Sequence, residues 1–175
     1  MRIHDKDFHT FISEAELDAI VKRLAAQISA DYSGRDLVVC PVLTGAFIFA
    51  ADLVRHITLP LEVSGVRYAS YSGLNSTGKV VCRLPFPDYI AGRDVLIVED
   101  VIDSGLSMQT VLRDAKDLKP ASVKVCTLFF KPDAFRGDYH VDYVGRTIGN
   151  EFIVGYGLDY DELGRNIPSV LVIDD

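Results

Sequence analysis

The sequence predicts an α/β fold in which a mostly parallel, twisted sheet is flanked by helices. Short apolar runs alternate with segments of helical period through the first 130 residues. One of these runs, Val95–Val98 (VLIV), is apolar at every position, as expected of a strand that is covered on both faces. Because helical segments separate consecutive strands, right-handed crossovers would bring these strands into one parallel sheet.

The composition is that of a globular domain. The 175 residues include 18 Lys and Arg against 25 Asp and Glu, so the formal net charge is -7. This acidic balance argues against a non-specific binder of nucleic acid or of an anionic membrane. Cys40, Cys82 and Cys126 lie singly, without the spacing of a disulfide framework or a zinc site. The sequence shows no leader pattern and no apolar run of about 18 residues. We therefore expect one cytoplasmic domain over residues 1–175, with no membrane and no nucleic-acid partner.

The first half of the chain divides into alternating helices and extended segments. Ser13-Glu14-Ala15-Glu16 has the spacing of a capping box, and the helix that it opens repeats apolar residues on one face as far as Ile28. Pro41 predicts that the strand around it ends there or is irregular. The elements expected after the first helix are the strand Leu37–Leu43, the mostly buried helix Ala46–Ile57, the extended segment Leu61–Tyr68 and the polar loop Ala69–Gly78.

The second half continues the same alternation. The strand Val95–Val98 leads through a Gly- and Ser-containing turn to a helix over Gly105–Leu118, and Pro120 ends this helix. Further strands are expected at Val123–Phe130, Phe152–Tyr156 and Val170–Ile173.

The most informative stretch is residues 95–107, VLIVEDVIDSGLS. The buried strand ends in two carboxylates, Glu99 and Asp100, and a third, Asp103, follows. A turn then feeds a helix N-terminus, which suits a phosphate group. Carboxylates beside an anion site are reasonable when they accept hydrogen bonds from sugar hydroxyls or meet phosphates through Mg²⁺. A ligand with a ribose between phosphate groups satisfies these demands together. Taken separately, the features could also be a solvated strand end and a helix cap.

This stretch resembles the phosphoribosyl-pyrophosphate (PRPP) signature of the type I phosphoribosyltransferases. Most of the remaining chain resembles their hypoxanthine-guanine branch, through VLTGAFIFAADL from residue 42, SYSGLNSTG from residue 70, Lys131, and FIVGYGLDYDELGRNIP from residue 152. The resemblance implies the type I phosphoribosyltransferase fold, with a core over about residues 12–145. A small hood over the purine would be formed by the N-terminal segment and part of residues 146–175.

The resemblance also implies a reaction and the residues that carry it out. The family transfers the 5-phosphoribosyl group of PRPP to N9 of a 6-oxopurine, releases pyrophosphate and uses Mg²⁺. For this chain, hypoxanthine or guanine would give IMP or GMP. The resemblance places Glu99 and Asp100 on the ribose hydroxyls and makes Asp103 the acid/base group at purine N7. The 5′-phosphate site would consist of Asp103, Ser104, Gly105, Leu106 and Ser107.

The resemblance also assigns residues to the pyrophosphate, the lid, the purine and Mg²⁺. Relatives often carry Lys where this chain has Thr44, so only a main-chain role is expected at that position, next to a cis peptide. A lysine at position 131 is donor-only and would select a 6-oxo group over a 6-amino group. The implied pyrophosphate site is Leu43, Thr44, Gly45 and Arg165; the lid is Ser70 and Tyr71; the purine site is Lys131, Phe152, Ile153 and Asp159; and the Mg²⁺ site is Glu99, Asp100 and Asp159.

Two other functions are compatible with the same scaffold. A xanthine-guanine specificity differs at the purine 2-position, which main-chain groups near Ile153 and Asp159 would read. A PRPP-sensing regulator that binds nucleic acid is disfavoured by the net charge of -7 and by the presence of Asp103 and Lys131. The resemblance also implies a homo-oligomer, a dimer or a tetramer.

Overall fold

The computed structural model describes residues 1–70 and 80–174. Its larger sheet has seven strands in the order β6-β5-β3-β7-β8-β9, with β4 paired to β3, and all of its neighbouring pairs except β5–β6 are parallel. The strands are β3 (Leu37–Leu43), β4 (Leu61–Val63), β5 (Val66–Ser70), β6 (Val80–Leu84), β7 (Asp94–Ile102), β8 (Ser122–Phe130) and β9 (Tyr143–Thr147). The predicted α/β class and mostly parallel sheet are confirmed.

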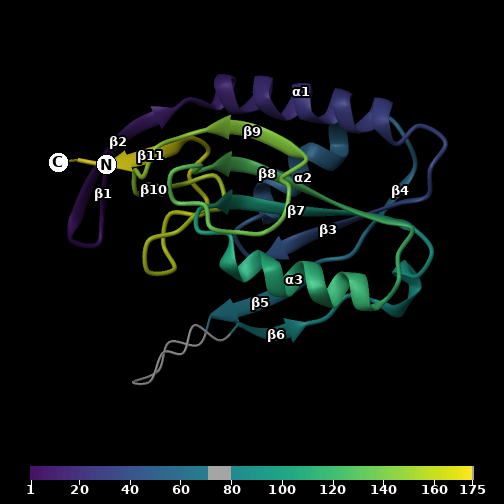
Figure 1. The fold of residues 1–175 in the computed structure, drawn as a ribbon. Coiled ribbons are helices and arrows are strands. Elements are labelled where there is room, and N and C mark those ends of the chain that lie inside the picture. The colour runs from purple at the N-terminus through teal and green to yellow at the C-terminus, as the bar shows by residue number, and fades with distance from the viewer. Residues whose placement is uncertain (71–79, 175) are drawn as a thin grey trace.

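Helices cover both faces of this sheet (Figure 1). Helices α1 (Glu14–Asp31) and α2 (Phe47–His56) lie together on one face, and α3 (Leu106–Asp117) lies on the other. The strand side chains alternate between two cores: Leu96 and Val98 pack with α1 and α2, while Val95 and Ile97 pack with α3. Both faces of β7 are therefore buried, as its apolar run predicts. A short 3-10 helix, η1 (Asp88–Ile90), precedes β7.

A second sheet joins the two ends of the chain. It has four strands in the order β1-β2-β11-β10, with antiparallel neighbours: β1 (Arg2–Ile3), β2 (Lys6–Ile12), β10 (Ile153–Val154) and β11 (Val170–Ile173). Ile3, Phe8, Val154 and Leu171 form its small core. The N- and C-termini consequently lie side by side (Figure 1).

Two expectations about where strands end differ from the structure. Pro41 lies inside β3 rather than at its end, so of the two expected alternatives the structure shows the irregular strand. On one side, β3 pairs with β4 as far as Val39 and with β5 only from Val42, so Pro41 falls where that neighbour changes. The β7 strand does not end at Val98, because β8 continues to pair with it as far as Ile102.

Other boundaries were also shifted or missed. The expected extended segment Leu61–Tyr68 is divided into β4 and β5, and the expected strand Phe152–Tyr156 is reduced to β10. The strands β1, β2, β6 and β9 have no counterpart among the sequence-based elements. In the part of the chain that the structure describes, no helix combines the length and the apolar character needed to cross a membrane.

The capping box predicted at Ser13 is present at the start of α1. The Ser13 side chain accepts from Glu16 N, and Ser13 N donates to Glu16 Oε2 at 2.9 Å. We expect Ser13→Ala to lower the free energy of unfolding by about 1 kcal/mol, because a donor of the first turn loses its partner. Urea denaturation measures this change. Ser33→Ala, an exposed position in the turn after α1, is the control. An equal loss in both variants would contradict a specific role for the cap.

Candidate active site

Three neighbouring strands bring their carboxyl ends to one edge of the large sheet. Because β3, β7 and β8 are parallel, the turn after β3, the turn after β7 and Lys131 after β8 all follow at this edge. Lys131 N donates to Ile102 O at 2.9 Å, which ties the exits of β7 and β8 together. Ligands of open α/β sheets bind beyond this edge.

Glu99 and Asp100 lie within β7, beyond the point where β3 stops pairing with it at Val98. Glu99 Oε1 accepts from Asp100 N at 3.1 Å, and Asp100 Oδ1 accepts from Val101 N at 2.7 Å. Burial raises the pKa of Glu99 well above the usual range, and the charge of Asp100 raises it further. Burial also raises the pKa of Asp100, although the charge of Arg165 acts in the opposite direction. The pair is therefore suited to a ligand that brings hydroxyl donors or a cation.

The turn Leu43–Gly45 passes directly beside this acid pair. A Cβ atom at Gly45 would lie 1.9 Å from Asp100 Oδ2, so only glycine lets the turn approach this closely. The Leu43–Thr44 peptide is cis, as the resemblance implies. A cavity of about 240 Å³ opens here, and its lining includes Leu43, Gly45, Glu99, Asp100 and Arg165. The structure therefore brings these sequence-predicted residues together.

The turn after β7 forms a second hollow, of about 210 Å³, which adjoins the first and shares Glu99, Asp100, Ser107 and Met108 with it. The helix α3 begins at Leu106, and its N-cap, Gly105, has a φ of 72° and makes no side-chain cap hydrogen bond. The N–H groups of a first helical turn have no partner within the helix and are available as donors; of these, Leu106 N donates to Ser104 Oγ at 3.5 Å. A Cβ atom at Gly105 would lie 2.5 Å from Phe135 Cε2, so the Phe135 ring packs closely against the turn. Ser104 N donates to Asp103 Oδ1.

Lys131 and Phe152 border the same edge from the opposite side. Lys131 Nζ donates to Glu151 O at 2.7 Å, which places the ammonium group beside the segment that carries Phe152. The Phe152 ring is 45% exposed and lies edge-on to Tyr160, with the centroids 5.6 Å apart. Ile153 is buried in β10 and is paired with Val172. An exposed aromatic ring beside a fixed cation is suited to a flat, polar ring such as a nucleobase.

Arg165 and Asp159 lie on the hairpin between β10 and β11. Arg165 Nη2 contacts Asp159 Oδ1 at 2.7 Å, and Arg165 Nη1 donates to Gly157 O at 2.8 Å. The other oxygen of Asp159 accepts from Glu162 N at 2.9 Å. Asp159 is thus engaged by its own hairpin. Among residues 1–70 and 80–174, no group of three or more His, Cys, Asp or Glu side chains forms a metal cage.

Two residues near the site were not singled out from the sequence. Tyr68 of β5 lines the cavity beside Glu99 and Asp100, and its hydroxyl donates to Asp114 Oδ2 on α3 at 3.0 Å. A Cβ atom at Gly157 would lie 2.2 Å from Gly45 O, so the hairpin touches the turn after β3. The Gly-Tyr-Gly sequence at 155–157 was the only local indication of such an approach. Of the expected lid residues, Ser70 ends β5, and Tyr71 lies outside the described residues.

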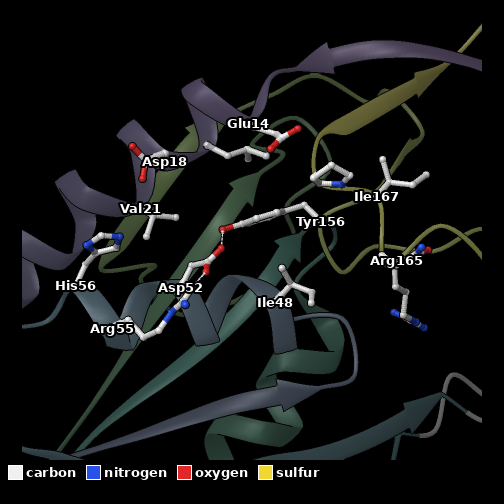
Figure 2. A pocket seen from close by; sticks show the side chains of 13 residues that line it. Glu14, Asp18, Val21, Ile48, Asp52, Arg55, His56, Tyr156, Arg165 and Ile167 are labelled. Atoms are coloured by element: carbon white, nitrogen blue, oxygen red, sulfur yellow. Dashed lines mark hydrogen bonds and ion pairs between the residues drawn. The ribbon is translucent and has the colours of Figure 1, made fainter.

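A larger cavity, of about 390 Å³, lies between α1, α2 and the hairpin (Figure 2). Arg165 borders both this cavity and the one beside Glu99 and Asp100. The larger cavity contains none of the acids of β7, and the candidate active site is therefore the smaller one at the strand ends.

Comparison with known proteins agrees with this geometry. Residues 13–161 match the family model described as the phosphoribosyl transferase domain. The chain belongs to the phosphoribosyltransferase family. The resemblance expected from the sequence, including the type I phosphoribosyltransferase fold, is confirmed.

This phosphoribosyltransferase is similar to several proteins named hypoxanthine-guanine phosphoribosyltransferase. It is 41% identical to that of Mycobacterium tuberculosis over 170 residues, which covers 93% of this chain and 84% of the relative. It is 35% identical to that of Staphylococcus aureus over 169 residues, 96% of this chain and 94% of the relative. A solved structure of the Bacillus anthracis enzyme has a TM-score of 0.90 at 40% identity, covering 97% of this chain and 100% of that one.

The raised pKa of Glu99 predicts that this side chain lowers the stability of the ligand-free phosphoribosyltransferase at neutral pH, although it is expected to help bind the ligand. The folded state holds the proton more tightly than the unfolded chain, so stability is lost as the pH rises from the ordinary pKa to the raised one. We expect Glu99→Gln to raise the melting temperature of the ligand-free protein at neutral pH. The difference should vanish in acid, where both side chains are neutral.

The resemblance gives Glu99 a hydrogen bond from a ribose hydroxyl of PRPP, and this expected role predicts that the same substitution weakens binding of PRPP. Hydrogen bonds to charged groups contribute about 1.5–3 kcal/mol, so we expect affinity to fall by roughly 10–100-fold. Calorimetry with PRPP and Mg²⁺ measures the affinity, and thermal unfolding at several pH values measures the stability. Asp117→Asn, an exposed acid at the end of α3, is the control and should change neither. A lower melting temperature for Glu99→Gln at neutral pH would contradict the interpretation.

Proposed function

We propose that this phosphoribosyltransferase acts in purine salvage and transfers the 5-phosphoribosyl group of PRPP to N9 of hypoxanthine or guanine. The products are IMP or GMP and pyrophosphate. One observation carries the proposal: the acid pair in β7, the turn into α3, and Lys131, which is bonded to the residue before Phe152, lie at one edge of the sheet. Sugar, phosphate and base each find a chemically suited surface at this edge.

In this proposal, the sugar lies between β7 and the turns beside it, with its 5′-phosphate at one turn and its pyrophosphate at the other. In this proposal, Glu99 and Asp100 accept hydrogen bonds from the ribose hydroxyls. The 5′-phosphate binds the N–H groups and hydroxyls of Asp103–Ser107, at the positive end of α3. Pyrophosphate binds the main chain of Leu43, Thr44 and Gly45, together with Arg165. A guanidinium suits this leaving group because it donates to two phosphate oxygens at once.

The same acid pair fits Mg²⁺. Mg²⁺ is usually held by one or two carboxylates together with substrate phosphates and water rather than by a cage of protein ligands. Two half-buried carboxylates with raised pKa values at the rim of the cavity meet this description. Bound there, Mg²⁺ would supply charge neutralisation to the leaving pyrophosphate. We propose Asp159 as a further contact to the ion.

Asp103 is the proposed acid/base group. Its side chain is exposed at the mouth of the turn, and Oδ1 accepts from Ser104 N. A purine that attacks through N9 must lose a proton, and a carboxylate at N7 can take or share this proton. As pyrophosphate leaves, positive charge develops on the ribose, and the nearby carboxylates of β7 stabilise it.

Lys131 and Phe152 are the proposed contacts to the base. Lys131 is donor-only, so it binds a 6-oxo group and opposes the 6-amino group of adenine. Phe152 stacks on the purine, while main-chain groups at Ile153 and the carboxylate of Asp159 lie near its 2-position. A xanthine-guanine specificity would differ at that position. Assays with PRPP, Mg²⁺ and each of four purines test the proposed function and distinguish the two specificities.

We further propose a cytoplasmic homo-oligomer, either a dimer or a tetramer. This oligomeric state is the one that the resemblance to the family implies. Cys40, Cys82 and Cys126 are all free thiols, which supports a reducing compartment.

Replacement of the acid/base group should separate turnover from binding. We expect Asp103→Asn to lower turnover by roughly 10²–10⁴-fold, because general acid–base catalysis contributes about that much. The affinity for PRPP should change little. An absorbance assay with hypoxanthine, PRPP and Mg²⁺ measures turnover, and Asp133→Asn, an exposed acid after Lys131, is the control. Turnover near that of the wild type would exclude Asp103 from this role.

Replacement of Lys131 should weaken binding of the purine base and leave binding of PRPP nearly unchanged. We expect Lys131→Gln to raise KM for hypoxanthine by roughly 10–100-fold, because a charged donor to O6 is lost. KM for PRPP should stay within about twofold of the wild type, since the affected contact is to the base. Steady-state kinetics with each substrate varied in turn measures both constants. Equal increases for the two substrates would contradict a base-specific contact.

A further inference from the structure

Tyr156 connects the hairpin that carries Arg165 to helix α2. Its side chain is 7% exposed and crosses the larger cavity, and its hydroxyl donates to Asp52 Oδ2 (Figure 2). The other oxygen of Asp52 pairs with Arg55 one turn later on the same helix. Both oxygens of this carboxylate are therefore engaged, so its position on α2 is well defined.

The backbone of Tyr156 is held in an unusual conformation. Its φ is 51°, in the left-handed region, which is a genuine outlier for a bulky residue. Such strain persists only where the surrounding contacts over-determine it. Here the contacts are the hydroxyl bond to Asp52 and a hydrogen bond from Tyr156 N to Ile167 O of 2.8 Å.

The next residue, Gly157, connects Tyr156 to Arg165 and to the turn after β3. Gly157 N donates to Arg165 O at 2.9 Å, and Gly157 O accepts from Arg165 Nη1 at 2.8 Å. A Cβ atom at Gly157 would lie 2.2 Å from Gly45 O, and one at Gly45 would lie 1.9 Å from Asp100 Oδ2. A shift of Tyr156 would therefore move Arg165 and press on the turn after β3.

We propose that Tyr156, held by Asp52, is a positioning residue for the pyrophosphate site. It sets Arg165 and the turn Leu43–Gly45 at the separation that the leaving group requires. This role rests on the proposed function, which assigns pyrophosphate to these residues. Two of the purine contacts depend on different bonds: Ile153 is fixed by its pairing with Val172 between β10 and β11, and Lys131 by its bond to Glu151 O, whereas Asp159 is paired with Arg165 itself. The effect of Tyr156 should therefore fall mainly on pyrophosphate, and much less on the purine.

The test removes only the hydroxyl. In the reverse reaction with IMP and pyrophosphate, we expect Tyr156→Phe to raise KM for pyrophosphate about three- to tenfold, the range for one lost hydrogen bond. KM for IMP should stay within about twofold, since the bonds that hold Lys131 and Ile153 are untouched. In the forward direction, KM for PRPP should rise and KM for hypoxanthine should not.

Two further variants separate positioning from simple stabilisation. Tyr143→Phe is the matched control, because Tyr143 is 2% exposed and donates to Asp31 Oδ2 at 2.8 Å, between β9 and α1. It should lower the melting temperature and leave every KM unchanged. Asp52→Ala should reproduce the change in KM for pyrophosphate. The double variant with Tyr156→Phe should be no worse than Asp52→Ala alone, because both changes remove the same contact.

The outcomes are distinct. If Tyr156→Phe and Tyr143→Phe both lower the melting temperature and leave KM for pyrophosphate unchanged, Tyr156 is purely structural and the inference is overturned. Equal increases in KM for IMP and pyrophosphate would overturn it as well. If Tyr156→Phe does not fold, Asp52→Ala, in a side chain that is 30% exposed, provides the same comparison, because alanine cannot accept from the Tyr156 hydroxyl. Failure of the wild type to turn over in either direction would instead overturn the proposed function, and this role with it.

Discussion

The acid pair near the carboxyl end of the inner strand β7 is the constraint on which the rest of the site depends. Glu99 and Asp100 are half-buried in β7, where burial raises the pKa of both carboxyls. The turn after β3 must pass beside them, and it does so because Gly45 has no side chain to meet Asp100. A pair held in this way is unfavourable in the empty protein and is stabilised by a ligand that brings hydroxyl groups or a cation. The residues that are to bind the ligand are thus the ones that destabilise the protein without it.

The packing around β7 offsets the unfavourable free energy of the two partly buried acids. Apolar residues fill both faces of β7 before the acids begin, and helices cover each face. Parallel strands of similar extent then end at one edge, which brings residues far apart in the sequence into one rim. The hairpin between β10 and β11 completes the rim from the second sheet, through Gly157 against Gly45 and Arg165 beside the acid pair.

Local features of the fold were well predicted from the sequence. The capping box at Ser13, the doubly covered strand around Val95–Val98 and the glycine at the start of α3 each depend on neighbours a few residues away. The strands that were missed depend on distant partners. β2 pairs with β11 from the other end of the chain, and β9 joins the sheet only beside β8. The extension of β7 to Ile102 likewise depends on the length of β8.

The sequence by itself determined the chemistry of this protein: three acids, a Gly- and Ser-containing turn and a donor-only lysine, in an order that resembles one family of transferases. Residue type and short spacing are enough for that, because charge, hydrogen-bonding capacity and backbone freedom belong to single residues. Only the tertiary structure decided which groups meet. The contacts of Gly157 with Gly45 and of Tyr156 with Asp52 each join residues more than 100 positions apart. Such contacts arise from the packing of the hairpin on α2 and the sheet, which no local pattern encodes.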